Sequence, residues 1–198
     1  MFAGAAAATE STIVPGVGIG KLKLGMTQAQ VEKVLGKEYL VNERATVGGA
    51  PYRELAWNFS TWSVGFLRSG ATWRVVQVET TLRAQRTLAG IGVGSPFQQV
   101  VREYSHVLCG GINWTFGPGY DLHGVLALIL VSKGPIYTAF AIEPVDRMDF
   151  FGAWRVYAVV VQQALPSHTS LQRVQEANKL IRRQCSDGWR ERGTPFRR

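Results

Sequence analysis

The spacing of apolar residues predicts two short helices, each preceded by a short alternating apolar segment that ends in glycine. For the first helix, Val31, Val34 and Leu35 recur at helical spacing after Thr27. Gly36 follows this stripe and is a natural helix end. The first helix is therefore expected between Thr27 and Gly36.

The second predicted helix follows Pro96 and ends in front of two glycines. Its apolar stripe consists of Val100, Val101, Tyr104, Val107 and Leu108. The stripe is followed by Gly110 and Gly111, so we expect this helix to end near Cys109.

The two helix starts belong to an internal repeat. Residues 19–31 have a counterpart 69 positions further on, in residues 88–100. In both copies an alternating apolar segment ends in glycine and a helix follows. Self-similarity at a fixed distance indicates two copies of one structural unit.

Both predicted helices also have capping residues at their starts. Thr27 and Gln30 have the spacing of a capping box, in which each side chain binds an exposed backbone amide. Ser95 and Gln98 have the same spacing, with Pro96 at the first helical position. We therefore expect two capped helices of similar construction.

Alternating segments rich in aromatic and branched residues predict strands after each helix. The predicted strands are residues 52–59, 62–68 and 73–82 in the first copy, and 125–131 and 136–142 in the second. The last strand of each set ends in an apolar residue and a glutamate, Glu79 or Glu143. This similarity makes the two glutamates repeat equivalents.

A third segment extends the second copy. Residues 154–161 predict one more strand, and an amphipathic helix carrying Leu171, Val174, Leu180 and Ile181 is expected after Pro166. The predicted fold class is α+β, a tandem repeat of helix plus antiparallel sheet with a C-terminal strand and helix. Its expected parts are a flexible tail (1–18), a first repeat (19–86), a second repeat (87–146) and a C-terminal unit (147–198).

The stretch Gly25-Met26-Thr27, with Val31 and the closing Leu35-Gly36, resembles the start of β-lactamase-inhibitor-protein-like domains. These domains share a fold with small SmpA/OmlA-type outer-membrane lipoproteins. The resemblance covers roughly residues 13–145, and the second copy departs from it with Gly94-Ser95-Pro96. It implies a saddle of sheets with helices behind, and a bacterial protein that grips a partner with a sheet face and loops.

Composition narrows the function classes. The chain has 198 residues, of which 46% are hydrophobic and 18% charged, so extensive disorder is not expected. The longest apolar run, residues 125–131, is far shorter than the roughly 20 residues of a membrane helix. Small residues at the N-terminus are compatible with a mature secreted domain whose leader was removed and replaced by a start methionine, or with a flexible tail.

The net charge of +8 is concentrated near the C-terminus. Residues 171–198 contain eight basic and three acidic residues. Such a tail contacts anionic surfaces or serves as a solvated end that aids solubility. No nucleic-acid-binding motif accompanies the charge, so no specific nucleic-acid partner is predicted.

The two cysteines, Cys109 and Cys185, lie 76 positions apart. Their spacing excludes zinc-finger and thioredoxin-type motifs. Two readings remain open, a disulfide that braces the C-terminal helix and two unrelated thiols.

Catalytic signals are weak. The glycine runs at residues 16–20 and 90–94 do not fit phosphate-binding motifs, and no nucleophile elbow is present. Asp121 and His123 could share a strand face, yet no third metal ligand has suitable spacing, so neither a metal nor a cofactor is predicted. A small enzyme built on Asp121, His123 and Glu143 is an alternative. Because the chain has only 14 acidic residues, a glycosidase with a catalytic pair of carboxyl groups is not expected.

Aromatic residues cluster on the predicted strands. Because alternate strand residues face opposite ways, Leu55 and Trp57 share one face and Tyr52 and Glu54 the other. Much of this surface is expected in the core, and an aromatic side chain left exposed would anchor a partner. The candidate partner-binding residues are Tyr52, Trp62, Trp73 and Tyr137.

These observations together predict a non-catalytic protein-binding module, secreted or in the periplasm or cell envelope. Inhibition of a secreted serine hydrolase such as a β-lactamase is one version of this function. An envelope scaffold or assembly role is the other.

Overall fold

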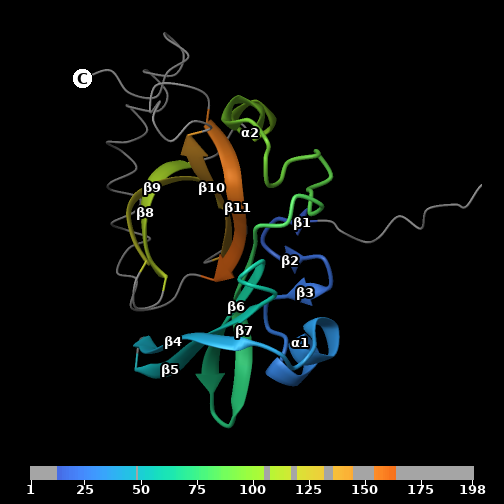
Figure 1. Ribbon diagram of the computed structural model, residues 1–198, viewed down its shortest axis with the longest axis vertical. Coiled ribbons are helices and arrows are strands. Elements are labelled where there is room, and N and C mark those ends of the chain that lie inside the picture. The colour runs from blue at the N-terminus through green and yellow to red at the C-terminus, as the bar shows by residue number, and fades with distance from the viewer. Residues whose placement is uncertain are drawn as a thin grey trace, which may run out of the picture.

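The computed structural model describes residues 13–47, 49–104, 108–116, 120–131, 136–144 and 154–163. Figure 1 shows a large curved sheet with two short helices and a small sheet on one side of it. The small sheet contains β1 (Ile13–Val14), β2 (Gly18–Ile19) and β3 (Leu22–Lys23). The helices are α1 (Gln28–Leu35) and α2 (Phe97–Glu103).

The large sheet has eight strands in the order β4-β5-β6-β7-β11-β10-β9-β8, and all neighbours are antiparallel. Its strands are β4 (Leu40–Val47), β5 (Ala50–Trp57), β6 (Trp62–Ser69), β7 (Thr72–Thr80), β8 (Leu108–Phe116), β9 (Tyr120–Val131), β10 (Ile136–Pro144) and β11 (Trp154–Gln163). Two meanders of four strands therefore meet at their last strands, β7 and β11.

The predicted α+β class is wrong, because the described chain is largely antiparallel sheet. Its helices contain only eight and seven residues. The second helix ends at Glu103, although its apolar stripe was expected to extend to Leu108. Leu108 instead begins β8, where Cys109 pairs with Leu128 of β9. Backbone bonds to a neighbouring strand thus replace the last predicted helical turn.

Two strands were not predicted, since their sequences lack a clear alternating pattern. β4 contains the polar run Asn42-Glu43-Arg44. β8 contains Gly110 and Gly111, which were interpreted as a helix stop. Both lie at the edges of the sheet, where a strand bonds to one neighbour only. The predicted strand at residues 154–161 is confirmed, and as β11 it lies in the middle of the sheet.

The two helix entries bind their meanders in the same way. In the first meander, Val75 of β7 exchanges two backbone hydrogen bonds of 2.8 Å with residues 25–26. In the second, Val156 of β11 exchanges bonds of 2.7 and 2.9 Å with residues 94–95. Gly25 and Gly94 both have positive φ, +82° and +89°, which explains why glycine occurs in both copies.

The similar roles of β7 and β11 change which strands of the two repeats correspond to each other. Each meander has a register shift between its third and fourth strands, just before Phe66 in β6 and just before Ile142 in β10. By position, β7 therefore corresponds to β11, and β6 to β10. Glu79 of β7 and Glu143 of β10 consequently lie on non-equivalent strands, contrary to the expectation from sequence.

Only one of the two predicted capping boxes forms. Thr27 Oγ1 accepts a bond from Gln30 N at 3.3 Å, while Thr27 N donates to Gln30 Oε1 at 2.8 Å. In the second copy Pro96 is the N-cap and makes no side-chain bond. The hydroxyl of Ser95 instead accepts bonds from Gly92 N and Arg86 Nη1, at 3.0 and 2.9 Å. It therefore closes the preceding loop rather than the helix.

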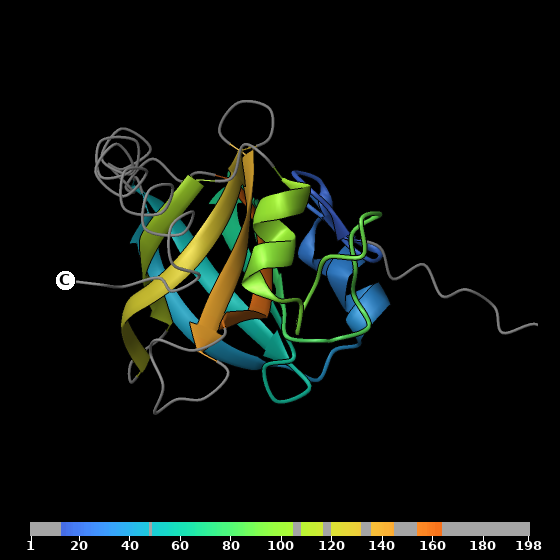
Figure 2. The same cartoon turned by 90° about the horizontal axis from the view of Figure 1, so that it is seen from above.

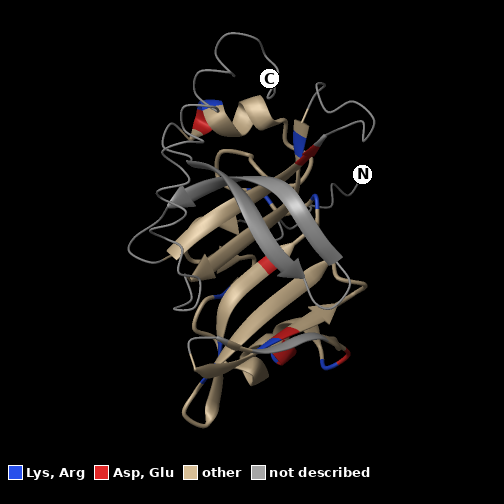
Figure 3. Cartoon of the chain, turned by 90° about the vertical axis from the view of Figure 1, so that its left-hand side faces the viewer, with Lys and Arg blue, Asp and Glu red and all other residues tan. Residues whose placement is uncertain are grey.

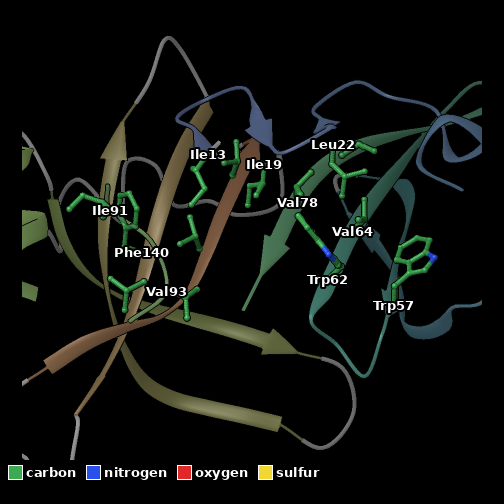
Figure 4. Packing of buried hydrophobic residues seen from close by; sticks show 14 of the residues in the cluster. Ile13, Ile19, Leu22, Trp57, Trp62, Val64, Val78, Ile91, Val93 and Phe140 are labelled. Carbon is green, nitrogen blue, oxygen red and sulfur yellow. The ribbon is translucent and has the colours of Figure 1, made fainter. Parts of the chain in front are cut away.

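The main core lies between the large sheet and the layer formed by β1–β3 and the two helices. We call the sheet surface that contacts this layer the outer face. Figure 4 shows side chains of both layers meeting there, including Ile19, Leu22, Val64, Val78 and Phe140. Seen from above, the sheet curls away from the helices, so its opposite surface is concave (Figure 2). We call that surface the inner face.

Within the described part of the chain, neither helix has the length and apolar character needed to cross a membrane.

Candidate functional site

Two adjacent rows of cross-strand neighbours form the centre of the inner face. The first row runs Glu54, Gly65, Gln77, Gln162 and Tyr137, from β5 to β10. The second row runs Ala56, Ser63, Glu79, Val160 and Ala139 across the same strands. Seen from the side in Figure 3, an acidic position lies in the middle of a sheet strand. Neither row contains a lysine or an arginine.

Glu79 is the central charged group of these rows. Its residue is only 6% exposed, and its cross-strand neighbours are Ser63 and Val160. Burial raises the pKa of Glu79 well above the usual 4.5, and the nearby carboxylate of Glu54 raises it further. A carboxyl group with these surroundings holds its proton to higher pH than an exposed one.

Three buried polar atoms near this centre have no hydrogen-bond partner among the described residues. They are Glu79 Oε2, Ser63 Oγ and the phenol oxygen of Tyr157. Ser63 is 4% exposed and lies directly opposite Glu79. Because buried polar groups are normally paired, three such atoms together indicate a site that takes an additional partner.

Tyr52 covers the first row from one side. Its hydroxyl lies 3.4 Å from Glu54 Oε2, to which it donates. A Cβ atom at Gly65 would come within 2.5 Å of the same hydroxyl, so only glycine leaves room for this phenol. The position of the Tyr52 ring therefore depends on the missing side chain of Gly65.

Two further tyrosines lie on the inner face from the second meander. The hydroxyl of Tyr137 donates to Gln162 Oε1 at 2.9 Å, and burial raises its pKa to about 12. Burial also raises the pKa of Tyr157, with additional effects of the charges of Glu79 and Glu143. Glu143 is itself bound by Arg155, at 3.1 and 3.2 Å. Glu79 has no corresponding basic partner among the described residues.

A second candidate site is the turn between β5 and β6, which we call the hairpin tip (residues 58–61). Asn58, Phe59 and Ser60 all have positive φ, between 49° and 65°. This left-handed conformation costs roughly 1–2 kcal/mol for each non-glycine residue. The side chain of Phe59 is fully exposed, at 102%. The predicted strand therefore ends at Trp57 instead of Phe59.

The hairpin tip is firmly held at its base. Trp57 and Trp62 are buried cross-strand partners immediately before and after the tip. Within the tip, the hydroxyl of Thr61 donates to the carbonyl oxygen of Asn58 at 3.0 Å. The carbonyl oxygen of Thr61 accepts bonds from the hydroxyl of Thr80 and from the Thr81 amide. Phe59 thus projects from a rigid support.

The four residues predicted to bind a partner do not form one surface. Tyr52 and Tyr137 belong to the inner face, whereas Trp62 lies in the outer core with 9% exposure. Trp73 is half-buried against the same core, with the Arg53 guanidinium 4.0 Å from its ring centroid. Two of the four therefore share a face, although three strands of the sheet lie between β5 and β10, which carry them.

The remaining predicted residues lie on β8 and β9 or outside the described residues. Cys109 is on β8, and Cys185 lies outside the described residues, so the disulfide stays a prediction. Asp121 and His123 lie on β9. No group of three or more metal-ligating side chains occurs in the part of the chain that the structure describes.

Sequence reasoning did not identify the centre of the inner face. Glu79 was considered only as an acid paired with Glu143, and Tyr157 and Gln162 were not considered. A signal was present, because Gln77 and Glu79 are polar residues on the same side of a strand with apolar neighbours. Such alternation indicates a strand with one apolar face and one polar face.

No protein-family model, curated protein or solved structure matches this chain.

Proposed function

We propose that this chain is a non-catalytic protein-binding module of an extracytoplasmic compartment, and that the hairpin tip is its main contact. The observation that carries this proposal is the full exposure of Phe59 on a rigid, left-handed turn. Exposed large apolar side chains at loop ends are typical contact residues, since loops on a rigid scaffold carry much of binding function.

The energetics of the hairpin tip support a binding role. Burying a phenylalanine side chain in a partner contributes about 1.5–3 kcal/mol. The bonds of Thr61 and Thr80 already order the turn, so binding costs little additional conformational entropy. Strain in a left-handed turn of three non-glycine residues also fits a functional position better than a connecting loop.

The resemblance to β-lactamase-inhibitor-protein-like domains suggests two versions of this function. An inhibitor would lower the rate at which a β-lactamase hydrolyses a chromogenic cephalosporin, with saturation near one equivalent of added protein. An envelope scaffold would leave that rate unchanged and would bind a different envelope protein. The enzymatic alternative stays a prediction; of its three residues, Glu143 forms an ion pair with Arg155 at 3.1 Å, and Asp121 and His123 lie on β9.

Site-specific photo-crosslinking tests the proposal. A benzophenone amino acid replaces Phe59 in one variant and exposed Ala71, in the turn between β6 and β7, in a matched control. Each protein is incubated with extracytoplasmic proteins of the native organism and irradiated. We expect one dominant adduct from position 59, a much weaker one from position 71, and competition by unlabelled wild-type protein.

A competition control in the same experiment distinguishes a specific contact from non-specific crosslinking. Excess Phe59→Ser protein is expected to compete poorly for the adduct at position 59, although its melting temperature stays within about 2 °C of wild type, as is usual for exposed sites. Equal labelling at positions 59 and 71, or full competition by Phe59→Ser, would contradict the proposal.

A further inference from the structure

The inner face is separate from the hairpin tip, and its chemistry indicates a different ligand. Glu79 lies in the middle of the second row, between Ser63 and Val160, and the row ends in Ala56 and Ala139. All four neighbours are small or lack a polar group able to pair with a carboxylate, apart from the hydroxyl of Ser63. The carboxyl group is thus placed among short side chains.

The unpartnered atoms indicate which hydrogen-bonding groups a ligand of this face must carry. Glu79 Oε2 can accept a hydrogen bond, and the hydroxyls of Ser63 and Tyr157 can both accept and donate. Leaving a buried polar group without a partner costs about 1–3 kcal/mol. One molecule that carries several donors would satisfy the carboxylate and the two hydroxyls together.

The charged residues of the inner face indicate whether the ligand is a cation or an anion. Glu79 has no basic partner among the described residues, and neither row contains a basic residue. Glu143, whose charge also acts on Tyr157, is bound by Arg155 and adds no unbalanced charge. A cation is therefore favoured over an anion. A metal ion is not favoured, because the described residues provide no group of three ligating side chains.

We propose that the inner face binds a compact organic cation with several N–H donors, a primary ammonium or guanidinium compound, with Glu79 as its counter-ion. Such cations offer three or five donors, which suits one carboxylate and two hydroxyls. The phenol rings of Tyr52 and Tyr157 lie on the same face and add aromatic surface of the kind that attracts organic cations. This proposal does not depend on the function of the hairpin tip.

Binding of simple probes to the purified full chain tests the proposal. Propylammonium and agmatine are titrated calorimetrically at constant ionic strength, with tetramethylammonium and butyrate as controls. Tetramethylammonium has the same charge but no N–H donor, and butyrate has the opposite charge. We expect saturable binding of the first two cations and none of either control.

A carboxyl-detected NMR titration on wild-type protein gives a second readout that requires no variant. Bound cation stabilises the charged form, so the pKa of Glu79 is expected to fall when propylammonium is added. An unchanged Glu79 signal at saturating cation would place the binding elsewhere and overturn the proposal.

Two variants then locate the site. Glu79→Gln keeps the shape of the side chain but removes its charge, and a lost charged hydrogen bond of about 1.5–3 kcal/mol corresponds to at least tenfold weaker binding. Glu38→Gln changes an exposed carboxylate after α1 and is expected to bind like wild type. Absence of saturable binding at tens of millimolar, equal binding of tetramethylammonium, or wild-type affinity in Glu79→Gln would each refute the proposal.

Discussion

On the outer face of the large sheet, Phe66 and Val78 pack against the layer of β1–β3 and the helices, in a continuous apolar core. On the inner face, the residues that alternate with them include Gly65 and Glu79, a glycine and a buried acid. The strands are the same, and burial is similar on both faces. The chemistry of the two faces is nevertheless opposite.

This difference indicates that one face of the sheet stabilises the fold and the other is suited to binding. The outer face buries large apolar side chains, which is the main favourable contribution to folding. The inner face buries carboxyl, hydroxyl and phenol groups, of which several have no partner among the described residues. The outer core also contains an unpartnered atom, the indole nitrogen of Trp154, but only the inner face combines such atoms with a buried carboxyl group. Since such groups cost free energy, this combination fits a role other than stability.

The largest effect is expected from a cavity on the outer face. Phe66 is fully buried in the core, so Phe66→Ala is expected to lower the free energy of unfolding by about 3–5 kcal/mol. Urea denaturation followed by tryptophan fluorescence measures this change. A loss below about 1 kcal/mol would mean that the outer face is not the main core.

A matched pair of valines compares the two faces directly. Val78 and Val160 are both fully buried in central strands, but Val78 pairs with Val64 and Val161, whereas Val160 pairs with Glu79. Val78→Thr puts a hydroxyl into an apolar core and is expected to cost about 1–3 kcal/mol. Val160→Thr places its hydroxyl beside the unpartnered Glu79 carboxylate and is expected to cost clearly less. Equal losses of unfolding free energy in the two variants, measured by urea denaturation, would show that the two faces do not differ in this respect.

A smaller, pH-dependent effect is expected from the inner acid. The pKa of Glu79 is higher in the folded chain than in the unfolded one, so folding favours the protonated form. The stability contribution is therefore complete below the ordinary carboxyl pKa of 4.5 and is lost as the pH rises towards the folded value. Over that interval the loss approaches about 1.4 kcal/mol for each pH unit.

The variant Glu79→Gln removes this dependence. Its stability relative to wild type is expected to increase from acidic to neutral pH, measured by thermal unfolding across that range. Glu54 and Tyr157, the ionisable groups whose charges interact with Glu79, are present in both proteins. A difference between the variant and wild type that stays constant with pH would contradict the buried charge of Glu79.

Much of the local structure could be predicted from the sequence. The capping box of Thr27, the stop at Gly36 and the strands of the β5–β7 meander and of β11 follow from patterns of a few neighbouring residues. The edge strands β4 and β8 were missed, since their partners, not their own sequences, determine that they are strands. The same reason explains why the second helix is shorter than predicted.

The candidate sites were harder to predict. Trp62 was interpreted as a contact residue, although it braces the hairpin tip from within the core, and Phe59 was assigned to a strand. Glu79 was matched to Glu143, because two short sequence ends looked alike. Only the three-dimensional arrangement, in which β7 and β11 pair as the last strands of their meanders, shows that β7 corresponds to β11 and not to β10.

The sequence by itself determined where helices begin, which residues alternate on each strand and where glycine permits a tight turn, because these depend on interactions between near neighbours. The tertiary structure alone decided that the two meanders share one sheet and that this sheet is strongly curved. It also decided that Phe59 projects into solvent. These features depend on contacts between residues far apart in the chain, which no local pattern encodes.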